Sequence, residues 1–184
     1  MRRRGAQVTD NHATCLPSGA GLDRDAFIAR FGGIYEHSPW VAREVFDNNY
    51  DGARNDIDVL AQRMAAVVDG AGYEQQLALL RAHPDLAGRL ALQGELTEAS
   101  TDEQKSAGLD QCTPEELVKF QSLNKGYTDK FGFPFILAVS GKNRAQILEN
   151  FETRLENSPK EEFAAALREV HKIALIRLEK LSNE

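Results

Sequence analysis

The sequence predicts an all-α protein, a single-domain bundle of about eight helices. Apolar residues recur three and four positions apart, as in Ile57, Leu60 and Met64, which is the spacing of one helix face. Proline follows serine or threonine at several expected helix starts, where it is favoured as the first helical residue. The sequence has no alternating strand-turn-strand pattern, and its 184 residues are enough for one hydrophobic core.

The chain divides into an arm and one domain. Residues 1–21 are polar and have no helical period, so we expect a flexible N-terminal arm. Residues 22–184 form the helical domain. Its first helices are expected from about Asp23 to Gly32, after the Ser38–Pro39 cap, and from about Asn55 to Gly70.

Proline and glycine organise the rest of the domain. Pro84 ends a fourth helix at His83 and starts a short one that runs through Leu90 to Gly94. Between Phe131 and Val139, glycine and proline break the helical rhythm, so this apolar stretch is expected to be extended. Helices are expected after the capping-box pattern Ser100 to Glu103, after Thr113–Pro114, around 147–155, and after Ser158–Pro159.

Composition argues against several classes of protein. The formal net charge of -6 disfavours nucleic acids and anionic membranes as partners. No apolar run approaches the ~20 residues of a membrane-spanning helix. The basic N-terminal residues are not followed by the apolar stretch of a secretory signal, and the last residues are not a peroxisomal targeting signal. The two cysteines make no disulfide framework. We therefore expect a reduced, cytoplasmic protein.

Metal-binding residue types are too scattered to form a recognisable site. The four histidines contain no pair four residues apart, and neither cysteine lies in a Cys-x-x-Cys unit. Glycine-rich nucleotide loops and the Gly-x-Ser-x-Gly nucleophile motif are also missing from the sequence. We expect neither a protein-bound metal nor a nucleotide cofactor.

His83 is the first candidate for chemistry. Pro84 places it at a break between helices, where a side chain can face a cavity, and imidazole has the unperturbed pKa nearest neutrality. A histidine held at a rigid corner suits proton transfer. A lone histidine at a helix break is nevertheless more often a structural cap, so its position alone leaves both interpretations open.

Glu103 and Gln104 are the second candidate. A capping-box glutamate already has a structural task at a helix start, and that interpretation competes evenly with a catalytic one. The two are compatible, because a carboxylate fixed by the helix can still face a ligand. Gln104 offers both donors and an acceptor beside it.

Arg177 is the third candidate, because it falls within an apolar stripe of the last helix. A buried guanidinium is costly unless an anion pairs with it. Its partner is either a protein carboxylate, which the spacing slightly favours, or a substrate carboxylate bound in fork geometry. The stripe is formed by Phe163, Leu167, Val170, Ala174, Leu178 and Leu181.

Asn124 and Tyr127 lie on a core-facing stripe, where packing is the default interpretation. The stretch from Phe131 to Phe135 also suits the core. An extended segment on helices leaves backbone N–H and C=O groups unpaired, however, and these are able to bind a planar polar ligand.

Several groups of residues run through the domain in order: Phe31 to Trp40, His83 to Arg89, Leu96 to Ser100 with Glu103–Gln104, Leu123–Asn124 with Tyr127, Phe131 to Phe135, and Arg177–Leu178. Together they resemble the OHCU decarboxylases, which act on 2-oxo-4-hydroxy-4-carboxy-5-ureidoimidazoline, the last unstable intermediate of urate oxidation. The resemblance covers about Leu22 to Leu181, and the spacing from His83 to Glu103 is also the family's.

The resemblance implies an all-α, commonly dimeric enzyme that forms (S)-allantoin without a cofactor. The family's catalytic histidine matches His83, and its paired glutamate matches Glu103. The N-terminal arm and the lack of a peroxisomal terminus depart from the family and bear on compartment rather than on chemistry. The implied substrate contacts are Pro84, Ser100, Gln104, Arg177 and the backbone of Phe135, Ile136, Leu137, Ala138 and Val139.

The chemistry of that reaction agrees with the candidate residues. Loss of carbon dioxide leaves electron density on a carbon beside an electron-accepting C=N group, and the site must hold the ring and deliver one proton to one face. With His83 as general acid, Glu103 beside it is expected to orient the imidazole and to favour its protonated form.

Two other functions stay open from the residues alone. A non-catalytic helical interaction module needs an exposed apolar patch, which Leu175 and Ile176 on the far side of the last helix would supply. The same two residues equally suit a homodimer interface. A hydrolase acting on a ureido compound ordinarily needs a metal or an activated nucleophile, and neither is recognisable in the sequence.

Overall fold

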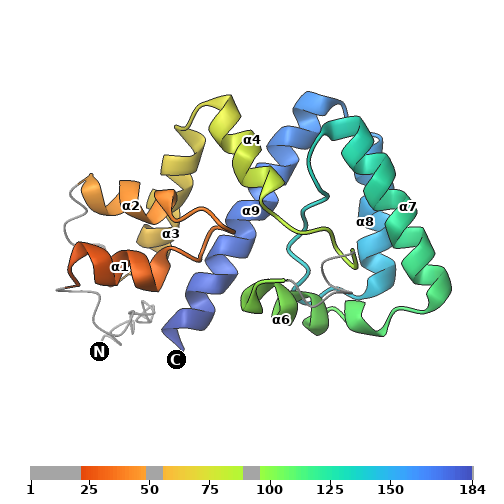
Figure 1. Cartoon of the computed structure of the whole chain (residues 1–184), viewed down its shortest axis with the longest axis horizontal. Helices are drawn as coiled ribbons and strands as arrows, with labels where there is room; N and C mark the ends of the chain where they lie inside the picture. Colours follow the sequence, from red (N-terminus) through yellow and green to blue (C-terminus); the bar gives the residue numbers. More distant parts are fainter. Residues whose placement is uncertain (1–21, 49–55, 89–95, 184) are drawn as a thin grey trace, which may run out of the picture.

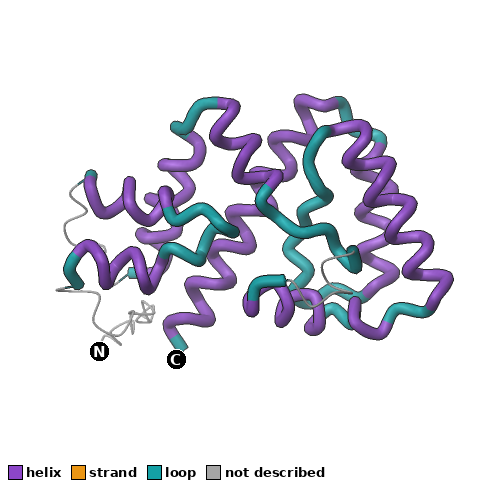
Figure 2. The backbone as a smooth tube through the Cα atoms, in the orientation of Figure 1, coloured by secondary structure: helices purple, strands orange, loops and turns teal. Residues whose placement is uncertain are grey.

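The computed structural model describes residues 22–48, 56–88 and 96–183, which form eight α-helices, one 3₁₀-helix and connecting loops without a β-strand (Figures 1 and 2). The predicted all-α bundle is thereby confirmed. The predicted arm, residues 1–21, lies outside the described residues. The elements are α1 (Arg24–Phe31), α2 (Trp40–Asp47), α3 (Ile57–Asp69), α4 (Tyr73–Arg81), α6 (Glu98–Ser106), η1 (Leu109–Gln111), α7 (Pro114–Phe131), α8 (Arg144–Leu155) and α9 (Pro159–Ser182).

Helix α9 is the central element of the fold. The side chain of Ser158 accepts a hydrogen bond from the N–H of Glu161, and Pro159 occupies the first helical position, as predicted. The helix contacts α3, α4 and α7, and in Figure 1 it crosses the molecule between α1–α3 and α6–α8. Its buried stripe includes Val170 and Leu178, and burying each such side chain contributes about 1.5–3 kcal/mol.

The loop between α1 and α2 approaches neighbouring backbone closely. A Cβ atom at Gly32 would lie 2.5 Å from the carbonyl oxygen of Ile28, so this position requires glycine. The loop packs on α9, where the hydroxyl of Tyr35 lies 2.9 Å from Nδ1 of His171. Helix α2 begins at Trp40, one residue later than predicted, and no side-chain hydrogen bond caps it.

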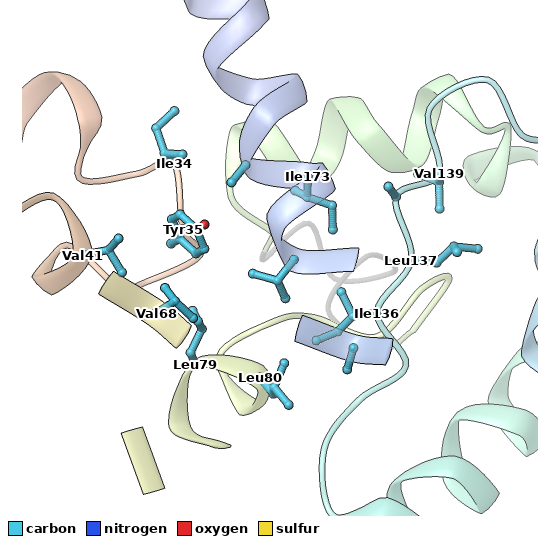
Figure 3. Packing of buried hydrophobic residues seen from close by; sticks show 14 of the residues in the cluster. Ile34, Tyr35, Val41, Val68, Leu79, Leu80, Ile136, Leu137, Val139 and Ile173 are labelled. Atoms are coloured by element: carbon cyan, nitrogen blue, oxygen red, sulfur yellow. The ribbon is translucent and has the colours of Figure 1, made fainter. Parts of the chain in front are cut away.

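Residues 133–139 form the predicted extended segment, which lies beside α9, but Phe131, where the prediction began, is the last residue of α7. Figure 3 shows Leu137 and Val139 on this segment, across from Ile173 of α9. Helix α7 ends before it at Gly132, whose φ of 78° favours glycine. The Phe135 side chain is fully buried, and its position fixes the course of the segment against α7 and α8.

A buried ion pair ties the extended segment to α8 and α9. Arg154 donates through Nε to Glu162 Oε1 at 2.8 Å and through Nη1 to the carbonyl of Ile136 at 2.6 Å. Asn157 and Tyr127 also donate to the Glu162 carboxylate. Since Glu162 is fully buried, these partners supply the hydrogen bonds that it would otherwise lose with water.

Candidate active site

A hollow opens between the end of α4, helix α6, the extended segment and α9. The structure brings together every sequence-predicted site residue except Ala138, which lines a smaller adjoining hollow. Such a concave site, mainly apolar with a few convergent polar groups, suits a small molecule. The lining residues are His83, Pro84, Leu86, Ser100, Glu103, Gln104, Phe135, Ile136, Leu137, Val139, Ile173 and Arg177.

His83 follows α4 and is buried at the wall of the hollow. Its Nδ1 lies 2.9 Å from the carbonyl oxygen of Leu79, so Nε2 is the nitrogen that can exchange a proton with a bound molecule. Burial lowers the pKa of His83 to about 4, although the Leu79 carbonyl and the Glu36 charge oppose that fall. The expectation that a neighbouring Glu103 raises this pKa is therefore not met, and the imidazole is neutral at neutral pH.

The loop that follows His83 is held by side-chain amides. Gln104 accepts a hydrogen bond from the N–H of Ala87 at 3.0 Å and donates to the carbonyl of Asp85 at 3.2 Å. Asn124 donates to the carbonyl of Leu86 at 2.9 Å. Residues 84–88 are not helical, and Ala87 has a φ of 48°, so the helix predicted from Pro84 does not start there. Residues 89–95, the remainder of that prediction, lie outside the described residues.

Glu103 is not part of a capping box. The cap of α6 is Thr97, whose hydroxyl accepts from the N–H of Ser100 at 3.3 Å, and the helix begins at Glu98. The predicted cap at Ser100 is therefore wrong, because Thr97 has the same capping chemistry one turn earlier. Glu103 lies in the second turn, and its carboxylate faces the hollow and Arg177.

Arg177 is buried, as its place in the apolar stripe indicates, and protein carboxylates occupy its guanidinium. Glu103 binds in fork geometry, with 2.7 Å from Nε to Oε1 and 2.8 Å from Nη2 to Oε2. Nη1 forms an ion pair with Oε2 of Glu36 at 2.8 Å. Of the two partners left open by the sequence, the protein carboxylate is the one present in the structure.

Glu36 is a site residue that sequence reasoning missed. It is 2% exposed and accepts hydrogen bonds from the hydroxyls of Thr97 at 2.7 Å and Ser100 at 3.0 Å. Burial alone would raise the pKa of Glu36, but Arg177 and Thr97 outweigh burial and the pKa is lowered. Glu36 belongs to the stretch Phe31 to Trp40, but no periodicity or cap marks it, because its partners are distant in sequence.

Residues of the extended segment line the hollow, and the peptide groups of the segment point to two opposite sides. The carbonyl of Ile136 accepts from Arg154, and the N–H of Ala138 donates to Glu169 Oε2 at 3.0 Å. Alternate residues of an extended chain point to the same side, so the peptide groups of Leu137 point the other way. Leu137 makes no hydrogen bond within the part of the chain that the structure describes.

Other site types find little support in the described ranges. No group of three or more His, Cys, Asp or Glu residues there could hold a metal ion. In those ranges no helix is long and apolar enough to cross a membrane. Leu175 and Ile176, considered as an exposed patch, are half-buried and pack against the core.

Known proteins resemble this chain over most of its length. The sequence model described as OHCU decarboxylase matches residues 20–179. The chain belongs to the OHCU decarboxylase family. A relative from Halalkalicoccus jeotgali, named 2-oxo-4-hydroxy-4-carboxy-5-ureidoimidazoline decarboxylase, is 44% identical over 160 residues, with 87% of each chain covered. A relative of the same name from Haloferax volcanii is 43% identical and covers 94% of this chain and 99% of its own.

Solved structures share the fold of this OHCU decarboxylase family member. A crystal structure of (S)-allantoin synthase is 34% identical, with a TM-score of 0.69, and covers 87% of this chain but 51% of that one. This chain therefore spans about half the length of that protein. A crystal structure of OHCU decarboxylase in the presence of (S)-allantoin is 21% identical, with a TM-score of 0.65, and covers 89% of this chain and 100% of its own. At that identity, the second likeness concerns the fold alone.

Proposed function

We propose that this protein decarboxylates 2-oxo-4-hydroxy-4-carboxy-5-ureidoimidazoline to (S)-allantoin during urate breakdown. Family membership and the names of its relatives support this substrate. The observation that carries the proposal is one hollow lined by the imidazole of His83 and by the Arg177–Glu103 pair. These groups fit a substrate that is anionic and must be protonated at carbon.

His83 delivers the proton in this proposal. The substrate carboxylate leaves as carbon dioxide, and its bonding electron pair forms a C=C bond while the adjacent C=N group takes up electrons and a proton at its nitrogen. A proton from Nε2 of His83 then forms the new C–H bond at the former C=N carbon, and the ring hydroxyl gives up its proton and becomes the carbonyl. One proton is taken up from solution in each turnover. Because the pKa of His83 is about 4 in the protein alone, the imidazole acquires its proton with the anion bound, whose charge raises that pKa.

Arg177 binds the substrate carboxylate on the edge that Glu103 holds in the structure. The lengths of the Glu103 contacts, 2.7 and 2.8 Å, mark that edge as suited to a carboxylate. Glu103, once displaced, turns within the same hollow toward His83 and favours its imidazolium form. When the substrate carboxylate replaces Glu103 on Arg177, Arg177 binds the substrate, Glu103 supports the imidazolium form of His83, and His83 donates the proton.

The remaining contacts hold the ring. Pro84, Ser100 and Gln104 line one side of the hollow, and the backbone of residues 135–139 lines another. The N–H and C=O of Leu137, which make no hydrogen bond to another described residue, suit the amide edge of a ureidoimidazoline. No cofactor is needed, because the substrate's own C=N group accepts the electron pair and the net step involves no redox change.

The proposal extends to the oligomeric state and the cellular location of the protein. The partial exposure of Leu175 and Ile176 on α9 supports a homodimer that forms through these two residues. Light scattering, which measures the mass of the protein in solution, tests this dimer. A cytoplasmic location is supported by the two cysteines, which make no disulfide framework.

The activity is tested by adding the protein to freshly formed products of urate oxidation and following circular dichroism. Spontaneous breakdown gives racemic allantoin, which has no signal. The proposal expects a rapid optical signal of the S enantiomer in proportion to enzyme. Production of an unchanged racemate at the uncatalysed rate would overturn the proposed function.

A further inference from the structure

We propose that Glu36 is a positioning residue: it stays on Arg177 as a permanent counter-ion, and thereby makes Glu103 the partner that the substrate carboxylate displaces. This inference rests on the proposed function and deepens it. It concerns a residue that does not line the hollow and that acts through Arg177.

Each nitrogen of the Arg177 guanidinium is already occupied. Nε binds Glu103, and Nη2 is shared between Glu103 and the hydroxyl of Ser100, 3.3 Å away. Nη1 is shared between Glu36 and the carbonyl of Ile34, 3.4 Å away. A substrate carboxylate can therefore reach Arg177 only by replacing a partner.

The two carboxylates differ in how firmly they are held. Glu36 is 2% exposed and also accepts hydrogen bonds from the hydroxyls of Thr97 and Ser100. The Glu103 side chain is 15% exposed and lines the main hollow and two adjoining ones. The Glu103 carboxylate is thus the one that a molecule in the hollow can displace.

The backbone that carries Glu36 is fixed to α9 at two places. The Ile34 carbonyl accepts from Arg177, and the Tyr35 hydroxyl binds Nδ1 of His171 at 2.9 Å. The N–H of Ser38 closes the turn onto the carbonyl of Tyr35 at 3.0 Å. Glu36 therefore cannot follow Glu103 out of the guanidinium without disrupting this loop.

Electrostatics supports the same division of roles. Arg177 is buried, and a buried guanidinium without a counter-ion is strongly unfavourable. With Glu36 in place, Arg177 keeps an anion throughout the exchange, and repulsion between the two carboxylates weakens the hold on Glu103. The charge of Glu36 raises the pKa of His83, while the charges of Arg177 and His37 lower it.

The test is Glu36→Gln, which keeps the shape of the side chain and removes its charge. Arg177 then has room for both Glu103 and the substrate carboxylate, so Glu103 stays on the guanidinium and does not reach His83. We expect kcat to fall about tenfold or more while KM is unchanged or lower, the size of a coupling between contacting residues. In a Glu103→Gln background the same substitution should change kcat by less than about threefold.

Glu152→Gln is the matched control, because it makes the same change on an exposed residue that pairs with Lys119. A wild-type protein without activity would defeat the proposed function itself. With an active wild type, the positioning role is overturned if Glu36→Gln raises KM at unchanged kcat, or lowers kcat equally in both backgrounds.

Thermal melting keeps the test decisive if Glu36→Gln does not fold. A permanent counter-ion is more important for stability than an exchangeable one, so Glu103→Gln should melt within a few degrees of the wild type. A Glu103→Gln variant that melts as low as Glu36→Gln would contradict the division of roles between the two carboxylates.

Discussion

At the scale of single residues, sequence reasoning finds side chains whose signal is local. The burial of Arg177 follows from a stripe on one helix, and the position of His83 follows from the proline after it. Glu36 has no such signal, because the side chains that bind it come from residues 97, 100 and 177. The identity of the Arg177 partners could not be predicted for the same reason.

Replacing Arg177 by methionine tests whether its protein partners matter for stability. Arg177→Met leaves the buried carboxylate of Glu36 and the partly buried carboxylate of Glu103 without their cation, which should destabilise the fold by about 3–5 kcal/mol. Arg177→Lys keeps a charge without the fork and should lose less stability but bind a carboxylate ligand more weakly. Urea unfolding without ligand measures the first effect, and an unchanged midpoint for Arg177→Met would contradict it.

The lowered pKa of His83 predicts a pH dependence of stability. The folded-state pKa of about 4 lies below the ordinary value of 6.5, so the unfolded chain binds a proton first as pH falls. Stability conferred by the neutral imidazole is complete above pH 6.5 and is lost between about pH 6.5 and pH 4. His83→Asn should lose less stability than the wild type across this window. Parallel urea midpoints for the two proteins between pH 7 and about pH 4.5 would contradict the buried, neutral histidine.

At the scale of elements, the predicted helix starts at Ser-Pro and Thr-Pro pairs that the structure confirms are those of α7 and α9. Helix starts for which the sequence offers two similar caps differ from the prediction. Ser158–Pro159 and Thr113–Pro114 start α9 and α7 as predicted. The pattern at Ser100 fails because Thr97 offers an equivalent hydroxyl one turn earlier. The helix expected from Pro84 does not start there, because Gln104 and Asn124 hold the loop in another shape.

The buried Arg154–Glu162 pair holds the extended segment in place, and we expect its loss to lower the stability of the fold. Arg154→Met strands the carboxylate of Glu162 and frees the carbonyl of Ile136, so it should cost about 3–5 kcal/mol of stability. Arg24→Met removes an exposed pair with Asp47 and should leave the unfolding midpoint nearly unchanged. Comparable urea midpoints for the two variants would show that the buried pair does not anchor the segment.

At the scale of the whole molecule, the sequence predicts the fold class and a set of candidate site residues, but not how these residues are arranged. Helical periods and caps fix the all-α class because they act within each element. The hollow is formed where α4, α6, the extended segment and α9 meet, and this meeting depends on packing between distant parts of the chain. Family resemblance supplied the set of residues, and the structure supplied their partners.

Metal removal tests the chemistry proposed for the whole site. The reaction needs an electron-accepting C=N group, which the substrate carries, and one proton from the protein. We therefore expect exhaustive chelation followed by assay to leave the rate of (S)-allantoin formation unchanged. A loss of activity that zinc or manganese restores would contradict this expectation.

Proton delivery by His83 is the central claim, and His83→Asn tests it most directly. The measurement is the circular dichroism of allantoin formed from fresh urate-oxidation products, beside a melting curve of the same variant. General acid catalysis typically contributes about 10²–10⁴-fold, so the folded variant should lose most of its turnover and yield nearly racemic allantoin. A folded His83→Asn protein that still forms (S)-allantoin at the wild-type rate would contradict the claim.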